Sequence, residues 1–304
     1  MAAVIETDKL TKTYGKNRGI VDVDLQVDSG EIFGFLGPNG AGKTTTIRTL
    51  LGFQRPASGT ASVFGLDSRR DSVQIRSRVG NLPGEFTLED RMTGEAMLRY
   101  FARLRGVESL DYARHLAGRL GADLKRPMRR LSRGNKQKVG LVLAMFHRPE
   151  LLILDEPTGG LDPLVREEFL ALIAEVRDEG RTVFFSSHVL GEVERICDRI
   201  AVIRGGRLAA VEPTSEIINK SFRHVRIAFA RQLKNKEMRK FAALAGVDNF
   251  DHDSNSLSFT LYGNYDDVVK LAARHTVVDI DFERPPLEEI FMTYYADPQE
   301  RGMP

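Results

Sequence analysis

A glycine-rich segment between an apolar run and a helix-compatible run constrains this chain more than any other feature. Residues 31–45 are EIFGFLGPNGAGKTT. They predict a buried strand, a G-x-x-x-x-G-K-T loop over residues 37–44 and a helix through Leu51, the order in which this pattern forms a phosphate-binding loop. The glycines let backbone N–H groups turn toward an anion, and the N-terminus of the following helix favours negative charge. We expect Lys43 to neutralise the outer phosphates and the Thr44 hydroxyl to bind Mg²⁺, so the sequence predicts a nucleoside triphosphate site.

The composition sets limits on the class of protein. A chain of 304 residues fits one large domain and one small one. Hydrophobic residues make up 42% and charged residues 28%, and the net charge is only +2, so nothing in the bulk composition demands nucleic acid or an anionic membrane. The single cysteine, Cys197, excludes an internal disulfide. Because we find neither a secretory leader nor an apolar run of about 18 residues, we expect a cytoplasmic protein.

The order of expected elements defines the fold class. We expect strands over residues 3–10, 20–27, 60–64, 151–154 and 182–186, and helices over residues 89–122 (broken), 135–146 and 163–179. Apolar strands that alternate with helices predict an α/β fold with a parallel sheet covered on both faces. The helical pattern predicts a subdomain inserted at about residues 85–148.

The pattern changes near residue 219, which suggests a first domain over residues 1–218 and a small α+β accessory domain over residues 219–304. Within the latter, residues 223–283 predict the order strand, helix, strand, strand, helix, strand, followed by a last helix over residues 287–294. This order favours a split-βαβ module. A loose β-extension of the first domain is the alternative.

Two carboxylates follow the apolar strand 151–154. In a parallel sheet, ligands gather at the carboxyl ends of the strands, so Asp155 is expected beside Thr44 as a Mg²⁺ ligand, directly or through water. Glu156 is placed to orient or deprotonate an attacking water. The alternative is that Asp-Glu-Pro starts a helix. His188 follows the next strand and is a candidate to bind the γ-phosphate or hold the water, although a lone histidine more often has no chemical role.

These motifs, in this order, resemble those of the ATP-binding cassette (ABC) ATPases over about the first 215 residues. The resemblance implies that residues 37–44 are the Walker A loop, that residues 151–156 are the Walker B strand, and that residues 160–163 belong to the D-loop. It also implies that residues 131–134 are the signature that closes on the γ-phosphate of a partner subunit. The catalytic residues implied are Glu156 and the switch histidine His188. The nucleotide-binding residues implied are Tyr14, which stacks on adenine, with Gly37, Pro38, Asn39, Gly40, Ala41, Gly42, Lys43, Thr44, Thr45, Ser132, Gly134 and Asp155.

Two positions depart from the family pattern. The signature is usually LSGGQ, whereas this chain has Leu-Ser-Arg-Gly-Asn with Arg133 in place of a glycine. Since Ser132 and Gly134 are kept, we expect the function to be retained. The glutamine of the Q-loop would fall at Gly84, which has no side chain for Mg²⁺. Glu85 is a substitute ligand or a purely structural residue, and the sequence leaves both open.

The resemblance also implies partners. ATP sites in this family are shared between two subunits, so one set of motifs implies a homodimer or a heterodimer with a similar chain. The chain would drive a separate permease on the inner face of the cell membrane, contacted by the helical subdomain and residues 81–87. Residues 282–291 resemble the ending of export-type cassettes related to antibiotic and multidrug efflux, so we expect an ATPase for export of a drug-like or other hydrophobic compound. Two alternatives are a soluble ABC ATPase acting on nucleic acid or ribosomes, for which the basic stretch 125–138 is a minor indication, and a module that holds ATP without hydrolysis.

Overall fold

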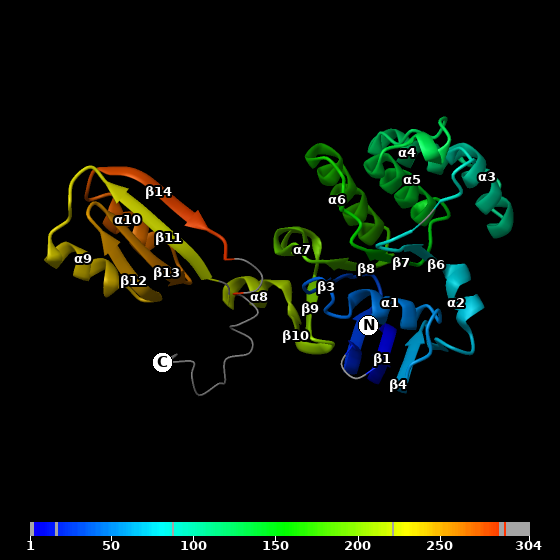
Figure 1. Ribbon diagram of the computed structural model, residues 1–304, viewed down its shortest axis with the longest axis horizontal. Helices are drawn as coiled ribbons and strands as arrows, with labels where there is room; N and C mark the ends of the chain where they lie inside the picture. Colours follow the sequence, from blue (N-terminus) through cyan, green and yellow to red (C-terminus); the bar gives the residue numbers. More distant parts are fainter. Residues whose placement is uncertain (1–2, 16–17, 87, 221, 286–288, 290–304) are drawn as a thin grey trace. The chain divides into compact units, whose positions relative to one another are not determined.

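The computed structural model describes residues 3–15, 18–86, 88–220, 222–285 and 289. The chain forms two compact units, Met1–Thr214 and Ser215–Pro304 (Figure 1). Within the described residues, the first unit contains two sheets and the second contains one. Each unit has its own hydrophobic core, so each is described by itself.

A six-stranded sheet is the centre of the first unit. Its neighbouring strands are parallel except at one edge, where β10 runs antiparallel to β9. Every residue of the three central strands is buried, as expected for a parallel sheet covered on both faces. In spatial order the strands are β10 (Arg207–Pro213), β9 (Arg199–Arg204), β3 (Ile32–Leu36), β8 (Thr182–Ser187), β7 (Leu151–Asp155) and β6 (Val79–Leu82).

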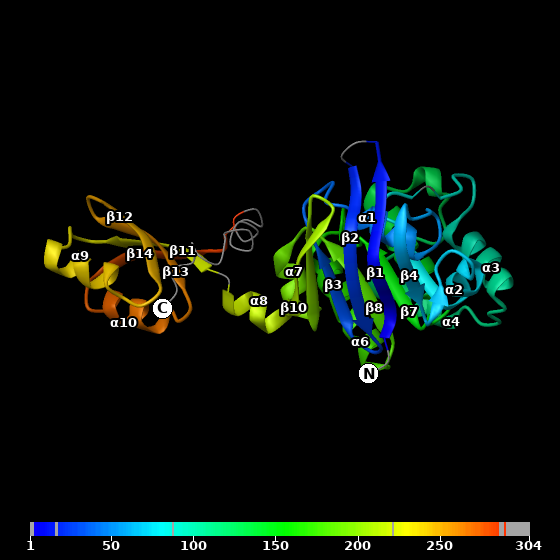
Figure 2. The same cartoon turned by 90° about the horizontal axis from the view of Figure 1, so that it is seen from below.

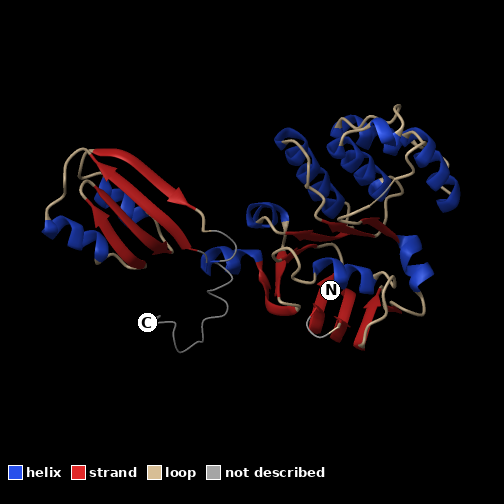
Figure 3. Ribbon diagram, in the orientation of Figure 1, coloured by secondary structure: helices blue, strands red, loops and turns tan. Residues whose placement is uncertain are grey.

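Helices cover both faces of this sheet (Figure 3). On one face, α1 (Lys43–Leu50) lies between this sheet and a second one (Figure 1). The other face carries the helices of the inserted subdomain and α6. The remaining helices of the unit are α2 (Ser72–Arg78), α3 (Gly94–Arg105), a short 3-10 turn (Met128–Arg130), α4 (Asp111–Leu120), α5 (Arg133–Met145), α6 (Pro163–Asp178) and α7 (Leu190–Ile196).

The second sheet of this unit is antiparallel, with the order β2 (Arg18–Asp28), β1 (Ala3–Tyr14), β4 (Ser58–Val63) and β5 (Leu66–Asp67). It shares one core with α1 and the central sheet, which includes Phe33, Phe35 and Ile47. The sequence predicts β1, β2 and β4 but not that they form a sheet of their own, because alternation along one strand does not say which strand is its neighbour.

The inserted helices pack around a small core of Met97, Met128, Leu131 and Val139. The start of α5 differs from the expectation. The helix begins at Arg133, before the expected Asn135, because the Ser132 hydroxyl accepts a hydrogen bond from the Asn135 N–H at 3.3 Å and caps the helix. The LSRGN segment therefore forms the first turn of α5.

The second unit begins within α8 (Thr214–Lys220) and contains a four-stranded antiparallel sheet. The helices α9 (Asn235–Ala242) and α10 (Asp266–Ala272) cover one face of the sheet (Figure 2) and enclose a core that includes Phe229, Phe241 and Phe259. The sheet order β12-β13-β11-β14 places one antiparallel strand inside each strand–helix–strand connection, which is the split-βαβ arrangement expected from the tail. The elements are β11 (Phe222–Phe229), α9 (Asn235–Ala242), β12 (Val247–Asp253), β13 (Ser256–Tyr262), α10 (Asp266–Ala272) and β14 (Val277–Glu283).

The last expected helix, over residues 287–294, lies outside the described residues apart from Glu289. Within the described part of the chain, no helix combines the length and the apolar content that crossing a bilayer requires.

Candidate active site

The glycine-rich loop connects β3 to α1 in a conformation that needs glycine. Gly40 and Gly42 have left-handed φ angles of 78° and 115°. A Cβ on Gly42 would lie 2.7 Å from the Ile20 Cγ2 atom, and a Cβ on Gly37 would lie 2.4 Å from the Ile203 carbonyl oxygen. The loop is therefore packed closely at Gly37 and Gly42. Because the Gly37 and Ala41 N–H groups donate to the carbonyls of Ser187 and Pro38, an anion at the start of α1 would be bound by the other N–H groups of the loop.

Lys43 lies inside this loop. It is 5% exposed, and its Nζ atom donates to the carbonyl oxygens of Gly37 at 2.5 Å and Pro38 at 3.1 Å. The same ammonium is 3.0 Å from Glu156 Oε1. A buried ammonium held by loop carbonyls and one carboxylate is a cation positioned to meet an anion that the loop encloses.

Thr44 and Asp155 provide adjacent hard oxygen atoms. Thr44 Oγ1 donates to Asp155 Oδ2 at 2.6 Å, and Ser186 Oγ donates to Asp155 Oδ1 at 2.6 Å. Asp155 is only 1% exposed. One carboxylate and one hydroxyl suit Mg²⁺, which usually completes its shell with phosphate oxygens and water. In the described ranges, no group of three or more acidic, cysteine or histidine side chains is arranged to hold a metal.

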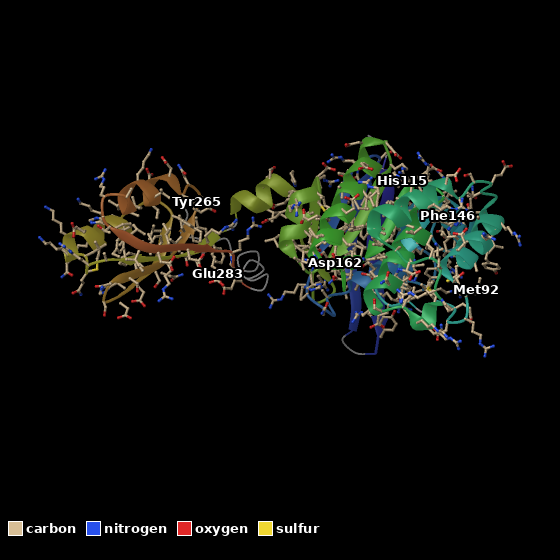
Figure 4. All side chains as sticks on the ribbon, turned by 90° about the horizontal axis from the view of Figure 1, so that it is seen from above. Met92, His115, Phe146, Asp162, Tyr265 and Glu283 are labelled. Carbon is tan, nitrogen blue, oxygen red and sulfur yellow. The ribbon has the colours of Figure 1, made fainter. Side chains whose placement is uncertain are left out.

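Glu156 and His188 form a close pair at the tips of neighbouring strands. Glu156 Oε2 lies 2.6 Å from His188 Nδ1. Glu156 has a left-handed φ of 51°, and its N–H donates to the Ser186 carbonyl at 3.2 Å. The expectation that Asp155 and Glu156 belong to a strand tip is confirmed. The helix-start alternative is wrong, because α6 begins at Pro163 and is capped by Asp162, which is labelled in Figure 4.

Two neighbouring cavities connect these side chains. The smaller has a volume of about 540 Å³ and the larger about 810 Å³. Glu156, Asn39 and Thr44 line both. The smaller is also lined by Tyr14, Gly19, Gly40, Gly42, Lys43, Thr45 and Gly205. The larger is also lined by Arg48, Gly84, Glu85, Phe86, Arg133, Lys136, Gln137, Asp155, Gly159 and His188.

Tyr14, at the end of β1, places an aromatic ring beside the smaller cavity. Its hydroxyl bonds to the Gln54 side chain, and the Lys12 ammonium lies 5.3 Å from the ring centroid. The ring is 43% exposed. A flat, accessible ring next to the phosphate loop is suited to stacking on a base.

The signature segment contacts the loop that follows the Walker B strand. A Cβ on Gly134 would lie 2.6 Å from the Gly160 carbonyl oxygen, and Gln137 Nε2 donates to the Pro157 carbonyl at 2.9 Å. Among the described residues that line the two cavities, neither Ser132 nor Gly134 is present. Arg133 lines the larger one.

The Q-loop position faces the expected metal ligand. A Cβ on Gly84 would lie 3.1 Å from Asp155 Oδ2, so any side chain at this position would start against that carboxylate. Glu85 is exposed and lines the larger cavity. Its role as a ligand stays a prediction.

Sequence reasoning missed Ser186 and Ser187. Both hydroxyls are buried at the end of β8, where Ser186 contacts Asp155 and Ser187 contacts Glu192. The sequence feature that could have identified them is a pair of polar residues at the end of an apolar strand, directly before His188.

A phosphate loop, a strand-tip carboxylate pair and a histidine on a parallel sheet define the class of P-loop nucleoside triphosphatases.

A family model described as ABC transporter matches residues 20–159. The bacitracin transport ATP-binding protein BcrA of Bacillus licheniformis is 36% identical over 241 residues, which cover 77% of this chain and 78% of that protein. The Nod factor export ATP-binding protein I of Cupriavidus metallidurans is 36% identical over 224 residues, which cover 72% and 74%.

Among solved structures, one titled as the ATP binding subunit of an ABC transporter superposes with a TM-score of 0.65 at 32% identity. The superposition covers 70% of this chain and 91% of the chain in that structure. This chain therefore belongs to the ABC transporter family, as an ATP-binding subunit that hydrolyses ATP.

Proposed function

We propose that this chain is the ATPase subunit of an exporter for antibiotic-like or other hydrophobic compounds, and that it works as an ATP-bound dimer attached to a separate permease in the cell membrane. The contact of Lys43 and His188 with the two oxygens of Glu156 is the observation on which the hydrolytic role depends. The transport role is supported by the similarity to proteins named for bacitracin transport and Nod factor export.

The site chemistry supports ATP hydrolysis. The triphosphate would occupy the glycine-rich loop, where it competes with loop carbonyls for Lys43, while the base stacks on Tyr14. Thr44 and Asp155 would hold Mg²⁺, which neutralises phosphate charge. Once a phosphate draws Lys43 away, the Glu156 carboxylate is freed to orient water and accept its proton.

The shared-site dimer is supported by the position of the signature. Ser132 and Gly134 lie outside the lining of this chain's own cavities, so a partner's nucleotide is their natural ligand. Arg133 adds a positive charge at the same helix start.

Exposed apolar side chains on neighbouring elements support a permease contact. Phe53, Val73, Tyr100 and Leu104 are 58%, 75%, 54% and 65% exposed. The segments that carry them are neighbours, because Arg105 at the end of α3 donates to the Ser77 carbonyl of α2 at 3.0 Å and the Arg76 guanidinium of α2 lies 5.2 Å from the Phe53 ring centroid. Exposed apolar side chains on neighbouring elements are typical of a protein interface.

The basic stretch 125–138 gives the nucleic-acid alternative little support. Lys138 is 3.5 Å from Asp162 and Lys136 is 3.6 Å from Asp90, and Arg126 pairs with Asp123. These pairs neutralise part of the charge that phosphate recognition would need.

The test combines one substitution with one purification. Glu156→Gln keeps the side-chain shape but removes the base, so we expect Mg-ATP binding to persist, turnover to fall at least about a hundredfold, and a dimer to accumulate in size-exclusion chromatography. Glu167→Gln, a matched change in an exposed ion pair, is the control. Native turnover in Glu156→Gln would refute the assigned base. Failure of the tagged chain to co-purify a polytopic membrane protein would refute the exporter.

A further inference from the structure

Glu192 is a buried carboxylate to which sequence reasoning assigns no role. It lies on α7, and its side chain is 5% exposed. Its Oε2 atom accepts hydrogen bonds from Thr158 Oγ1 at 2.9 Å and from Ser187 Oγ at 3.0 Å. Its Oε1 atom lies 3.5 Å from Arg166 Nε. Burying a carboxylate is costly unless donors or cations surround it, and here two donors and one cation come from three separate segments.

Two of those segments carry the residues expected to hydrolyse ATP. Thr158 lies two positions after Glu156, Ser187 directly precedes His188, and Arg166 is on α6. One carboxylate therefore joins the turn that follows the expected base to the strand end that leads into the histidine.

The backbone around this contact is under constraint. Glu156 has a φ of 51°, a strained conformation for a non-glycine residue that persists only where its surroundings hold it. The Ser187 Oγ atom also accepts a hydrogen bond from the Val189 N–H at 3.0 Å. The Ser187 carbonyl oxygen accepts one from the Gly37 N–H at 3.2 Å. The segment after β7 and the end of β8 are thus held by one hydrogen-bond network, in which Glu192 is the common acceptor.

We propose that Glu192 is a positioning residue for ATP hydrolysis: it holds the main chain on both sides of the Glu156–His188 pair and so maintains their 2.6 Å contact. It touches neither residue of the pair. The inference rests on the function proposed above for Glu156 and His188.

Glu192→Gln tests the proposal at constant volume. Both hydroxyls donate to Oε2, so the amide satisfies them only with its oxygen in that place, which turns its NH₂ group toward the Arg166 guanidinium and removes the negative charge. The two hydrogen bonds lose their charged acceptor and Arg166 loses its partner, and changes of this kind correspond to about a tenfold or larger effect, so we expect kcat to fall at least about tenfold. KM for Mg-ATP should stay within about twofold, because Glu192 contacts neither Lys43 nor Tyr14. Glu167→Gln is the matched control, since Glu167 pairs with Arg195 across the same two helices at the surface, and its kcat should be unchanged.

A second measurement separates positioning from a general loss of structure. In a His188→Ala background, Glu192→Gln should lower the remaining kcat by less than about twofold, because the pair it aligns no longer exists. An equal loss in both backgrounds would overturn the proposal. Thr158→Val removes one donor, keeps the shape, and carries the same expectation should Glu192→Gln fail to fold.

The outcomes for the two proposals are distinct. If Glu156→Gln and His188→Ala both keep native turnover, the proposed function fails. If both lose turnover while Glu192→Gln keeps it, only the positioning role is refuted.

Discussion

Removing the Ser186 hydroxyl should destabilise the first unit through the carboxylate it supports. Ser186 is 0% exposed, and its Oγ atom donates to Asp155 Oδ1 at 2.6 Å and accepts from the Glu156 N–H at 3.2 Å. In Ser186→Ala, the buried Asp155 loses one donor, and hydrogen bonds to charged groups contribute about 1.5–3 kcal/mol. The Glu156 N–H keeps the Ser186 carbonyl at 3.2 Å, so no backbone donor is left unpaired. We therefore expect a loss of about 2 kcal/mol in the free energy of unfolding of this unit.

The measurement is urea unfolding of the full chain followed by circular dichroism, together with the thermal midpoint. For a unit of this size, a loss of about 2 kcal/mol lowers the midpoint by about 4–8 °C. Ser77→Ala is the matched control, because the exposed Ser77 hydroxyl donates only to the Gln74 carbonyl at 2.7 Å. We expect it to change stability by less than about 0.5 kcal/mol. If Ser186→Ala is as stable as Ser77→Ala, the Asp155 carboxylate does not depend on this donor and the reasoning is wrong.

Two further predictions concern a titrating group and a departure from the family pattern. Burial, with the nearby positive charges of Arg105 and Arg181, lowers the pKa of His147 to about 4. Because the pKa of folded His147 lies below its value in the unfolded chain, proton binding favours the unfolded state. The contribution of neutral His147 to the free energy of unfolding is therefore complete above about pH 6.5, and about 3 kcal/mol of it is lost as the pH falls to about 4. Urea unfolding at stepped pH should show a shallower acid loss of stability for His147→Asn than for the wild type; equal slopes would contradict the assignment. Arg133→Gly should keep steady-state ATP turnover within about threefold, since Ser132 still caps α5, and a collapse of turnover would show that the arginine is needed.

Much of the fold and part of the site were predictable from local patterns. Residues 37–44 specify a phosphate loop because glycine spacing, lysine and the flanking elements act within one short segment. The apolar strand before Asp155 places that carboxylate at a sheet edge, and the contact between Thr44 and Asp155 was expected from the rule for parallel sheets. The order of elements in the second unit also follows from local periodicity.

By itself, the sequence determined the class of protein, the triphosphate site and the segments that carry the carboxylates and His188, since each depends on neighbouring residues. Tertiary structure alone decided the order of strands in two sheets, the ion pair between Lys43 and Glu156, and the buried acceptor Glu192 that joins Thr158 to Ser187. Such contacts join residues far apart in the chain, and which strand tips meet is fixed only when the hydrophobic faces of all the elements are buried together.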